Sequence, residues 1–99
     1  MATDIEFDIE NDLELTHEKR YKVYILNDDY TSMNFVVNIL IEIFHKDYEE
    51  AEKLMLEVHE KGQGLCGIYT YEVAETKIAQ VHNSARKSGY PLKAYMEEE

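Results

Sequence analysis

The feature that most constrains the fold is a stretch over residues 31–44 that is apolar on almost every side of a helix. Its polar positions Asn34, Asn38 and Glu42 recur every four residues and form one narrow stripe. A helix that is apolar over most of its circumference is buried on several sides, so this segment is the predicted central helix, with Thr31 as its N-cap. The apolar residues follow helical spacing and then widen that face: Met33, Phe35, Val36, Val37, Ile39, Leu40, Ile41, Ile43 and Phe44.

The polar stretch just before this helix holds more oxygen acceptors than one helix cap needs. It follows a run rich in β-branched and aromatic residues, Tyr21 to Leu26, which is typical of a strand. The first backbone N–H groups of a helix lack partners within it, so side-chain oxygens commonly cap them. The surplus acceptors could instead face outward and hold a metal ion, a Lys or a free α-amine. The side chains concerned are those of Asn27, Asp28, Asp29 and Thr31.

The rest of the chain is expected to form two further helices and two further strands. Gly67 lies inside one of these strands and indicates a bulge or a close backbone approach. The order strand, helix, helix, strand, helix, strand predicts an α+β fold, a small single domain with a three-stranded antiparallel sheet and helices on one face. The expected elements are a helix capped by Asp47 and closed by Gly62 to Gly64, a strand over 65–69, a helix capped by Thr70 and closed by Gly89, and a strand from Pro91.

The N-terminal segment alternates acidic and apolar residues over positions 4–15. Period-two alternation usually means a strand, but one side of this strand would be wholly acidic, with no basic residue before His17. We therefore favour a flexible acidic extension over residues 1–20, followed by a core domain over residues 21–99. Such an extension is either a docking arm or an inert solvating segment.

The charge balance excludes several classes of partner. The formal net charge of −11 argues against nucleic acid and against anionic membranes, so a partner surface is expected to be basic. A lone Cys66 cannot form an internal disulfide, which fits a reducing compartment. No secretory signal and no apolar run near the roughly 18 residues of a membrane span are present. A cytoplasmic protein is expected.

Motifs for catalysis or for metal binding are absent from the sequence. Cys66 and His59 could in principle form a thiol–imidazole pair, but Cys66 lies in an apolar strand, which is typical of a structural thiol. The glycines around Gln63 lack the lysine and the spacing of a phosphate loop, and the four histidines lack zinc-binding spacing. Asp28 and Asp29 are not followed by the rest of a calcium-binding loop. We expect no enzyme activity, no cofactor and no metal.

A binding site is the more specific hypothesis. Asn27, Asp28 and His59 would put polar groups at the rim of an apolar hole if the two helices converge. Methionine is an adaptable lining for an aromatic or aliphatic guest, although such a stripe taken alone is usually plain core. The apolar candidates lie on neighbouring positions of the first two helices: Met33, Val36, Met55 and Val58.

Four sequence blocks follow one another along the chain: NDDYTSMNFV at 27–36, MLEVHEKG at 55–62, LCGIYTYEVAETK at 65–77, and Pro91-Leu92. The chain is similar to the ClpS family, the adaptors of the Clp protease system that recognise N-degrons, over roughly residues 21–96. The departures are Ser32 where proline is usual, Asn34 where Glu is common, and Tyr95 with the final acids in the last strand.

This resemblance implies a non-catalytic adaptor, monomeric when free. It would bind proteins that begin with Phe, Leu, Tyr or Trp and deliver them to the unfoldase ClpA, or ClpC, for degradation. The alternative is a modulator or inhibitor domain that binds the unfoldase and has no cargo pocket of its own. By similarity, Glu72 and Lys77 would face the N-terminal domain of the unfoldase, and the N-terminal extension would help delivery.

The resemblance also assigns roles within the cargo site. For Asp29 the resemblance leaves two roles open, which are shaping the turn and adding negative potential to the pocket. The free α-amine and the first peptide group of the cargo would be contacted by Asn27, Asp28 and His59. The cavity for the first side chain would be lined by Thr31, Met33, Val36, Met55, Val58 and Leu92.

Overall fold

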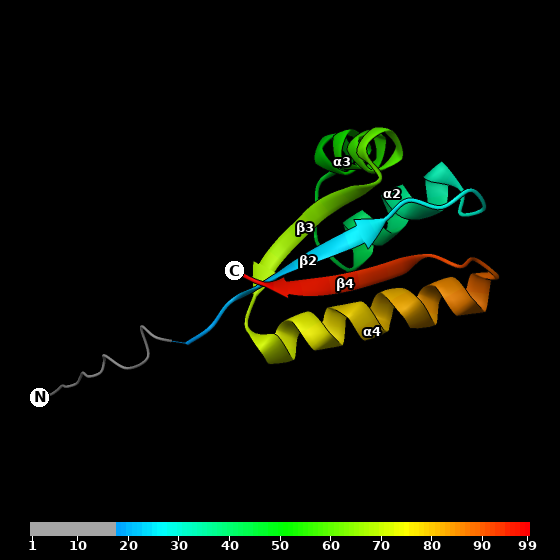
Figure 1. The fold of residues 1–99 in the computed structure, drawn as a ribbon. Coiled ribbons are helices and arrows are strands. Elements are labelled where there is room, and N and C mark those ends of the chain that lie inside the picture. Colours follow the sequence, from blue (N-terminus) through cyan, green and yellow to red (C-terminus); the bar gives the residue numbers. More distant parts are fainter. Residues whose placement is uncertain (1–17) are drawn as a thin grey trace, which may run out of the picture.

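The structure is a computed structural model that describes residues 18–99. The alternating segment, residues 4–15, lies outside these residues, as does the predicted flexible extension over residues 1–20 apart from residues 18–20. The elements follow the predicted order and form the predicted α+β fold (Figure 1). They are β2 (Tyr21–Leu26), α2 (Met33–Glu42), α3 (Tyr48–Lys61), β3 (Gln63–Tyr69), α4 (Tyr71–Ser88) and β4 (Lys93–Glu98).

The three strands form one antiparallel sheet in the order β3-β2-β4. The register of β2 with β3 shifts once, because Val23 pairs with Gly67 while Tyr24 pairs with Leu65. Cys66 is the extra residue of this bulge. The predicted bulge is therefore confirmed. The close neighbour of Gly67 is a side chain and not the predicted backbone, since a Cβ there would lie 2.3 Å from the Tyr69 hydroxyl oxygen.

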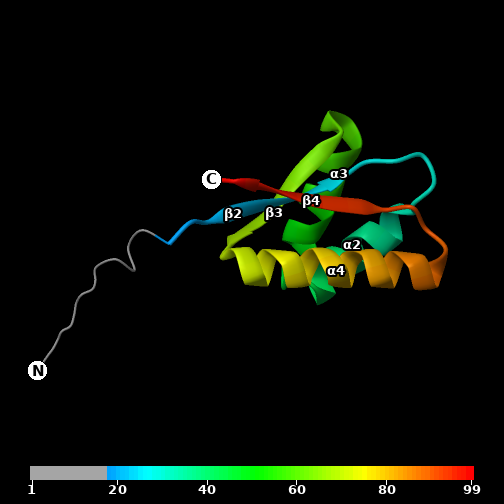
Figure 2. The ribbon, with the colours of Figure 1, turned by 60° about the horizontal axis from the view of Figure 1, so that its bottom comes forward.

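The core lies on one face of the sheet. Val23 and Ile25 of β2 are fully buried, whereas the residues between and beside them are only half-buried. All three helices add buried side chains to the same cluster, including Leu40 of α2, Met55 of α3 and Val81 of α4. Figure 2 shows α2 and α4 together on one side of the strands. The central position predicted for the first helix is confirmed, since four of its residues are buried.

The helix ends follow the predicted capping chemistry with one correction. Asp47 forms a full capping box, and Gly62 and Gly89 end α3 and α4 in the left-handed conformation. The N-cap of α2, however, is Ser32, whose Oγ accepts a hydrogen bond from the Phe35 N–H at 3.1 Å. Thr31 is not the cap, because its N–H and its hydroxyl both donate to the carboxylate of Asp28.

Two strand boundaries also differ from the prediction. β3 begins at Gln63 rather than at Leu65, because Gln63 pairs with Leu26 across the sheet. β4 begins at Lys93 rather than at Pro91, and proline could not donate the backbone hydrogen bond that such pairing uses. No helix within residues 18–99 is long and apolar enough to cross a membrane.

Candidate functional site

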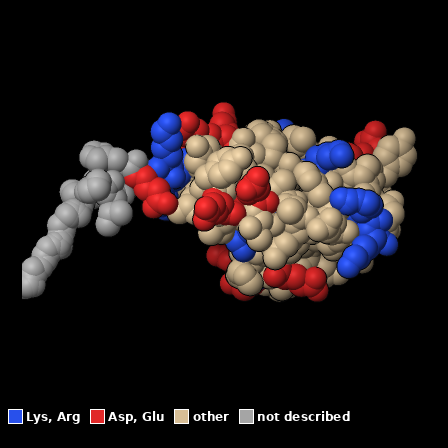
Figure 3. Space-filling view, turned by 90° about the horizontal axis from the view of Figure 1, so that it is seen from below, with Lys and Arg blue, Asp and Glu red and all other residues tan. Residues whose placement is uncertain are grey.

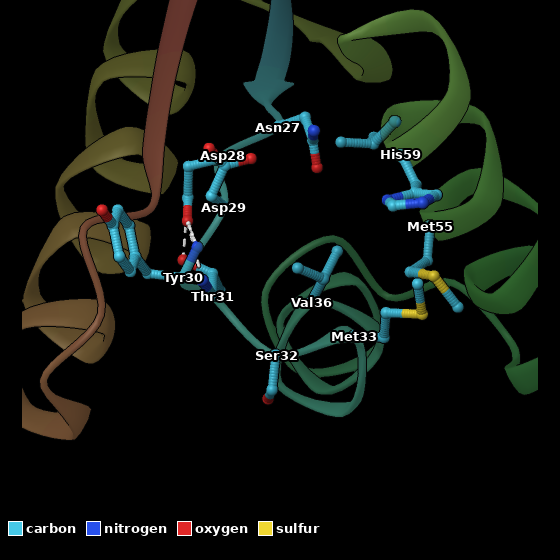
Figure 4. A pocket seen from close by; sticks show the side chains of 11 residues that line it. Asn27, Asp28, Asp29, Tyr30, Thr31, Ser32, Met33, Val36, Met55 and His59 are labelled. Carbon is cyan, nitrogen blue, oxygen red and sulfur yellow. Dashed lines mark hydrogen bonds between the residues drawn. The ribbon is translucent and has the colours of Figure 1, made fainter.

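A hollow of about 390 Å³ lies at the N-terminal end of α2, between the β2–α2 loop and α3. Figure 4 shows side chains from these three segments surrounding it. Its size is in the range of small-molecule and side-chain pockets. The lining residues are Asn27, Asp28, Asp29, Tyr30, Thr31, Ser32, Met33, Val36, Met55, Val58 and His59.

The floor of the hollow is apolar and belongs to the core. Val36, Met55 and Val58 are exposed by no more than 9%. Met33 stands at the mouth with 46% of its surface exposed. The missing side chain of Gly64 lets β3 approach α3 closely, since a Cβ there would lie 2.7 Å from Cγ2 of Val58. Packing of the sheet against α3 therefore positions the floor.

Two polar side chains reach the hollow from opposite walls. The backbone N–H of Asn27 donates to the carbonyl of Gly62 at 2.9 Å, which ties the loop to the end of α3. His59 follows the buried Val58 on α3 and is itself exposed. In Figure 4 the Asn27 amide and the His59 ring face each other across the opening. Hydrogen-bonding groups and an apolar floor thus line the same hollow.

Asp28 organises the loop. Its Oδ1 accepts from the N–H groups of Tyr30 and Thr31 at 2.8 and 2.7 Å, and its Oδ2 accepts from the Thr31 hydroxyl at 2.8 Å. Partial burial alone would raise the pKa of this carboxyl, but the hydrogen bonds outweigh it and hold the pKa below its ordinary value. Asp28 is therefore ionised at neutral pH, and it both shapes the turn and places a negative charge at the rim.

The structure brings two further residues to the rim that were not predicted. Tyr30 is 78% exposed and lines the hollow from the loop. In the sequence, Tyr30 could have been noticed as an aromatic residue between two polar ones in a predicted surface turn. Ser32 also borders the hollow, although its hydroxyl is occupied in capping α2. Asp29 is exposed beside them.

Leu92 is the one predicted cavity residue that the structure does not bring to this hollow. It is only 3% exposed and packs in the core cluster. It borders a separate hollow, together with His82 and Arg86 of α4. The reason is its position just before β4, where its side chain joins the buried face shared with Ala94.

Glu72 and Lys77 lie together elsewhere, on α4. They border a shallow hollow of about 350 Å³ with Val73, Thr76 and Gln80. Lys77 also has a structural contact that the sequence did not reveal, because its Nζ donates to the carbonyl of Ile43 at 2.7 Å. The same ammonium lies 5.9 Å from the ring centroid of Phe44 and 5.4 Å from that of Tyr69.

The site has binding groups rather than reactive ones. Cys66 is buried away from it, and burial raises the pKa of its thiol to about 12. A thiol of this kind stays protonated, so it is neither a nucleophile nor a metal ligand at neutral pH. Within residues 18–99, no group of three or more His, Cys, Asp or Glu side chains could hold a metal ion.

Comparison with known proteins gives one consistent result. The family model described as ATP-dependent Clp protease adaptor protein ClpS matches residues 16–95. The ClpS adapter protein of Wolinella succinogenes is 49% identical over 97 residues, which cover 98% of this chain and 95% of the relative. The corresponding protein of Oleidesulfovibrio alaskensis is 53% identical over 98 residues, covering 99% and 94%.

A solved structure agrees with these relatives. The structure of Agrobacterium tumefaciens ClpS2 bound to L-phenylalaninamide is similar with a TM-score of 0.81 and 31% sequence identity. The match covers 84% of this chain and all of that one. The chain therefore belongs to the ClpS family of ATP-dependent Clp protease adaptors, and it is an adaptor protein rather than an enzyme.

Proposed function

We propose that this adaptor binds proteins whose first residue is Phe, Leu, Tyr or Trp and delivers them to a ClpA or ClpC unfoldase. The first side chain enters the hollow at the end of α2, and the free α-amine meets Asn27, Asp28 and His59 at its rim. The observation that supports this proposal is one hollow whose lining combines the ionised Asp28 and two further polar residues with an apolar floor.

The rim selects for the start of a chain. A protonated α-amine offers several N–H donors and a positive charge, whereas an internal peptide group offers one neutral N–H. Charge-assisted hydrogen bonds to an amine contribute about 1.5–3 kcal/mol each. Asp28 supplies the charge, since its Oδ2 accepts a single hydrogen bond within the loop and keeps a lone pair free. Asp29 adds negative potential from the solvent side.

The floor selects for a large apolar side chain. Burying a Phe or Leu side chain contributes roughly 1.5–3 kcal/mol, and the two methionine thioethers, at Met33 and Met55, adapt to rings and branches alike. Two bonds to the amine and one buried side chain give about 5–9 kcal/mol before entropy costs. Affinities near micromolar follow, which suits a cargo that must later be released.

The ligand of the similar solved structure supports this assignment. ClpS2 of Agrobacterium tumefaciens is bound to L-phenylalaninamide. That molecule has a free α-amine, a Phe side chain and an amide where the next peptide bond would stand. It is therefore the smallest mimic of a chain that begins with Phe.

Delivery requires a second surface that stays accessible while cargo is bound. The α4 hollow with Glu72, Val73 and Gln80 is open, and Lys77 contacts Ile43 at the end of α2 opposite to the pocket. Since α2 has ten residues, its two ends lie about 15 Å apart. We propose this α4 surface as the contact with the N-terminal domain of the unfoldase.

A paired titration tests the cargo proposal. A fluorescent peptide with N-terminal Phe should bind with a dissociation constant near micromolar, and its acetylated twin should bind at least tenfold more weakly. His59→Ala should weaken binding several-fold and leave the far-UV circular dichroism unchanged. Equal binding of both peptides would contradict recognition of the α-amine. Binding of neither, with retained affinity for the unfoldase, would support a modulator without cargo.

A further inference from the structure

A second hollow, of about 210 Å³, lies where α4 ends and β4 begins, and its polar lining is basic. This is unusual in a chain with a net charge of −11. Figure 3 shows Lys and Arg side chains gathered at this end of the molecule, on the right of the view. No acidic residue lines the hollow, which is formed by His82, Arg86, Tyr90, Pro91, Leu92 and Lys93.

The two cations of this hollow have no acidic partner within residues 18–99. The guanidinium of Arg86 donates to the amide oxygen of Asn83 at 3.3 and 3.4 Å. The ion pair found within residues 18–99 joins Lys19 to Glu98, neither of which lines this hollow. Burial lowers the pKa of His82, and the charges of Lys93 and Arg86 lower it further. The ring is therefore neutral, and its Nε2 accepts the N–H of Ala94 at 3.0 Å.

This basic hollow is next to the cargo pocket. Lys93 pairs with Leu26, the last residue of β2, and the next residue in the chain is Asn27, which lines the pocket. Figure 1 shows the β2–α2 loop and the C-terminal end of α4 at the same end of the molecule. A polypeptide that leaves the pocket on this side would therefore pass the basic hollow.

We propose that Arg86 and Lys93 form a second cargo subsite that takes carboxylate side chains shortly after the first residue of the cargo. The inference rests on the proposed function and deepens it by naming the cargo class: a bulky hydrophobic first residue followed by Asp or Glu. Neighbouring strands lie about 4.8 Å apart and an extended chain advances about 3.3 Å per residue. The carboxylates thus belong at about the third to fifth cargo positions.

The expected effect is moderate, because both cations are exposed to solvent. Exposed ion pairs contribute little individually, so two of them should strengthen binding about 3- to 10-fold at low ionic strength. The gain should decrease as salt is raised, since the screening length falls to about 8 Å near physiological ionic strength.

The test compares two peptides that differ only in charge. Both begin with Phe-Ala; one continues with three Glu residues and the other with three Gln residues. The readout is the ratio of their dissociation constants, measured by fluorescence anisotropy at low salt for each protein variant. The variants are the native chain, the double substitution Arg86→Gln with Lys93→Gln, and the charge-preserving pair Arg86→Lys with Lys93→Arg. Lys53→Gln, on the exposed surface of α3, is the matched control.

We expect the native chain to bind the Glu peptide about 3- to 10-fold more tightly than the Gln peptide. The Gln double variant should bring this ratio to about one, while the charge-preserving pair and the Lys53 control should keep it. A native ratio of one or less, with the Gln peptide still bound, overturns the subsite and leaves the proposed function intact. A native preference that survives in the Gln double variant also overturns it. Binding of neither peptide overturns both proposals together.

Discussion

The two ends of α2 differ in how they are packed: the N-terminal end borders an open hollow, and the C-terminal end is covered by other side chains. At the N-terminal end, Ser32 caps the helix and Asp28 holds the loop, and a hollow of about 390 Å³ remains open beside them. At the C-terminal end, the Ile43 carbonyl accepts a hydrogen bond from Lys77, whose ammonium lies over the rings of Phe44 and Tyr69. The N-terminal end thus borders an unfilled hollow, whereas the space at the C-terminal end is filled by the protein's own side chains.

We expect this difference to separate the residues that bind cargo from the residues that stabilise the fold along one helix. The helix is held by buried residues in its middle, such as Ile39 and Leu40, and by the closed end. The open end can therefore present polar and flexible groups without weakening the fold. Substitutions at the open end should change cargo binding more than stability, and those at the closed end should do the reverse.

Asp28→Ala should give the largest effect on binding. It removes the ionised carboxylate that we propose as the partner of the α-amine, and it also removes three hydrogen bonds of the loop. Loss of one charge-assisted contact weakens binding about 10- to 100-fold. The free energy of unfolding should fall by only about 1–2 kcal/mol, as for the loss of a helix cap. Peptide titration and urea unfolding measure the two quantities.

Asp29→Ala is the matched control for this prediction. Asp29 lies next in the chain and is exposed, and within residues 18–99 it has no hydrogen bond comparable with those of Asp28. Its loss should weaken binding only a few-fold, through negative potential, and leave stability unchanged. If Asp28→Ala unfolded the domain, the open end would be structural and the comparison would fail.

Lys77→Met should affect mainly stability. Methionine keeps most of the apolar stem but loses the hydrogen bond to Ile43 and the contact of the ammonium with two rings. The free energy of unfolding should fall by about 1–2 kcal/mol, with peptide affinity changed less than twofold. Gln80→Met, one turn further along α4 and exposed, should change neither. A tenfold loss of peptide affinity in Lys77→Met would show that the two ends are not independent.

The sequence predicts the open end better than the closed one. The run from Asn27 to Met33 concentrates polar groups before an apolar helix, so both the loop and the pocket floor can be inferred from local pattern and resemblance. The contact of Lys77 with Ile43 joins residues 34 positions apart. No local pattern encodes such a contact, because it depends on how α4 packs against the end of α2.

Competition for hydrogen bonds explains the difference at the N-cap, and core packing explains the difference at Leu92. Thr31 has the composition of an N-cap, but Asp28 captures its N–H and its hydroxyl, and the cap passes to Ser32. Leu92 matches a cavity position by resemblance, yet its packing places it in the core. Pattern gives the residue types at a site, whereas packing and hydrogen-bond geometry decide which of them reach it.

Met33→Ala should change selectivity with little effect on stability. Met33 stands at the mouth of the hollow with 46% exposure, where it can screen cargo side chains that branch at their first carbon. Shortening it should improve binding of peptides that begin with Ile or Val a few-fold, while the free energy of unfolding changes by less than about 0.5 kcal/mol. Titration of Phe, Ile and Val peptides provides the measurement. Unchanged affinities for the Ile and Val peptides would mean that Met33 does not act as the screen.

The smallest expected effect is the pH dependence of the open end. The folded protein holds the pKa of Asp28 below its ordinary value of 3.8, so the unfolded chain binds this proton more readily than the folded one. The stabilisation is fully present above about pH 4 and is lost as the pH falls through the lowered value. The difference in unfolding free energy between the native chain and Asp28→Asn should therefore be constant from pH 7 to 5 and shrink in stronger acid. Ser32→Ala removes an uncharged cap from the same end, so its difference from the native chain should not follow pH in this way. If both differences shrank together, the acid sensitivity would belong to the whole fold and not to the carboxylate at the rim.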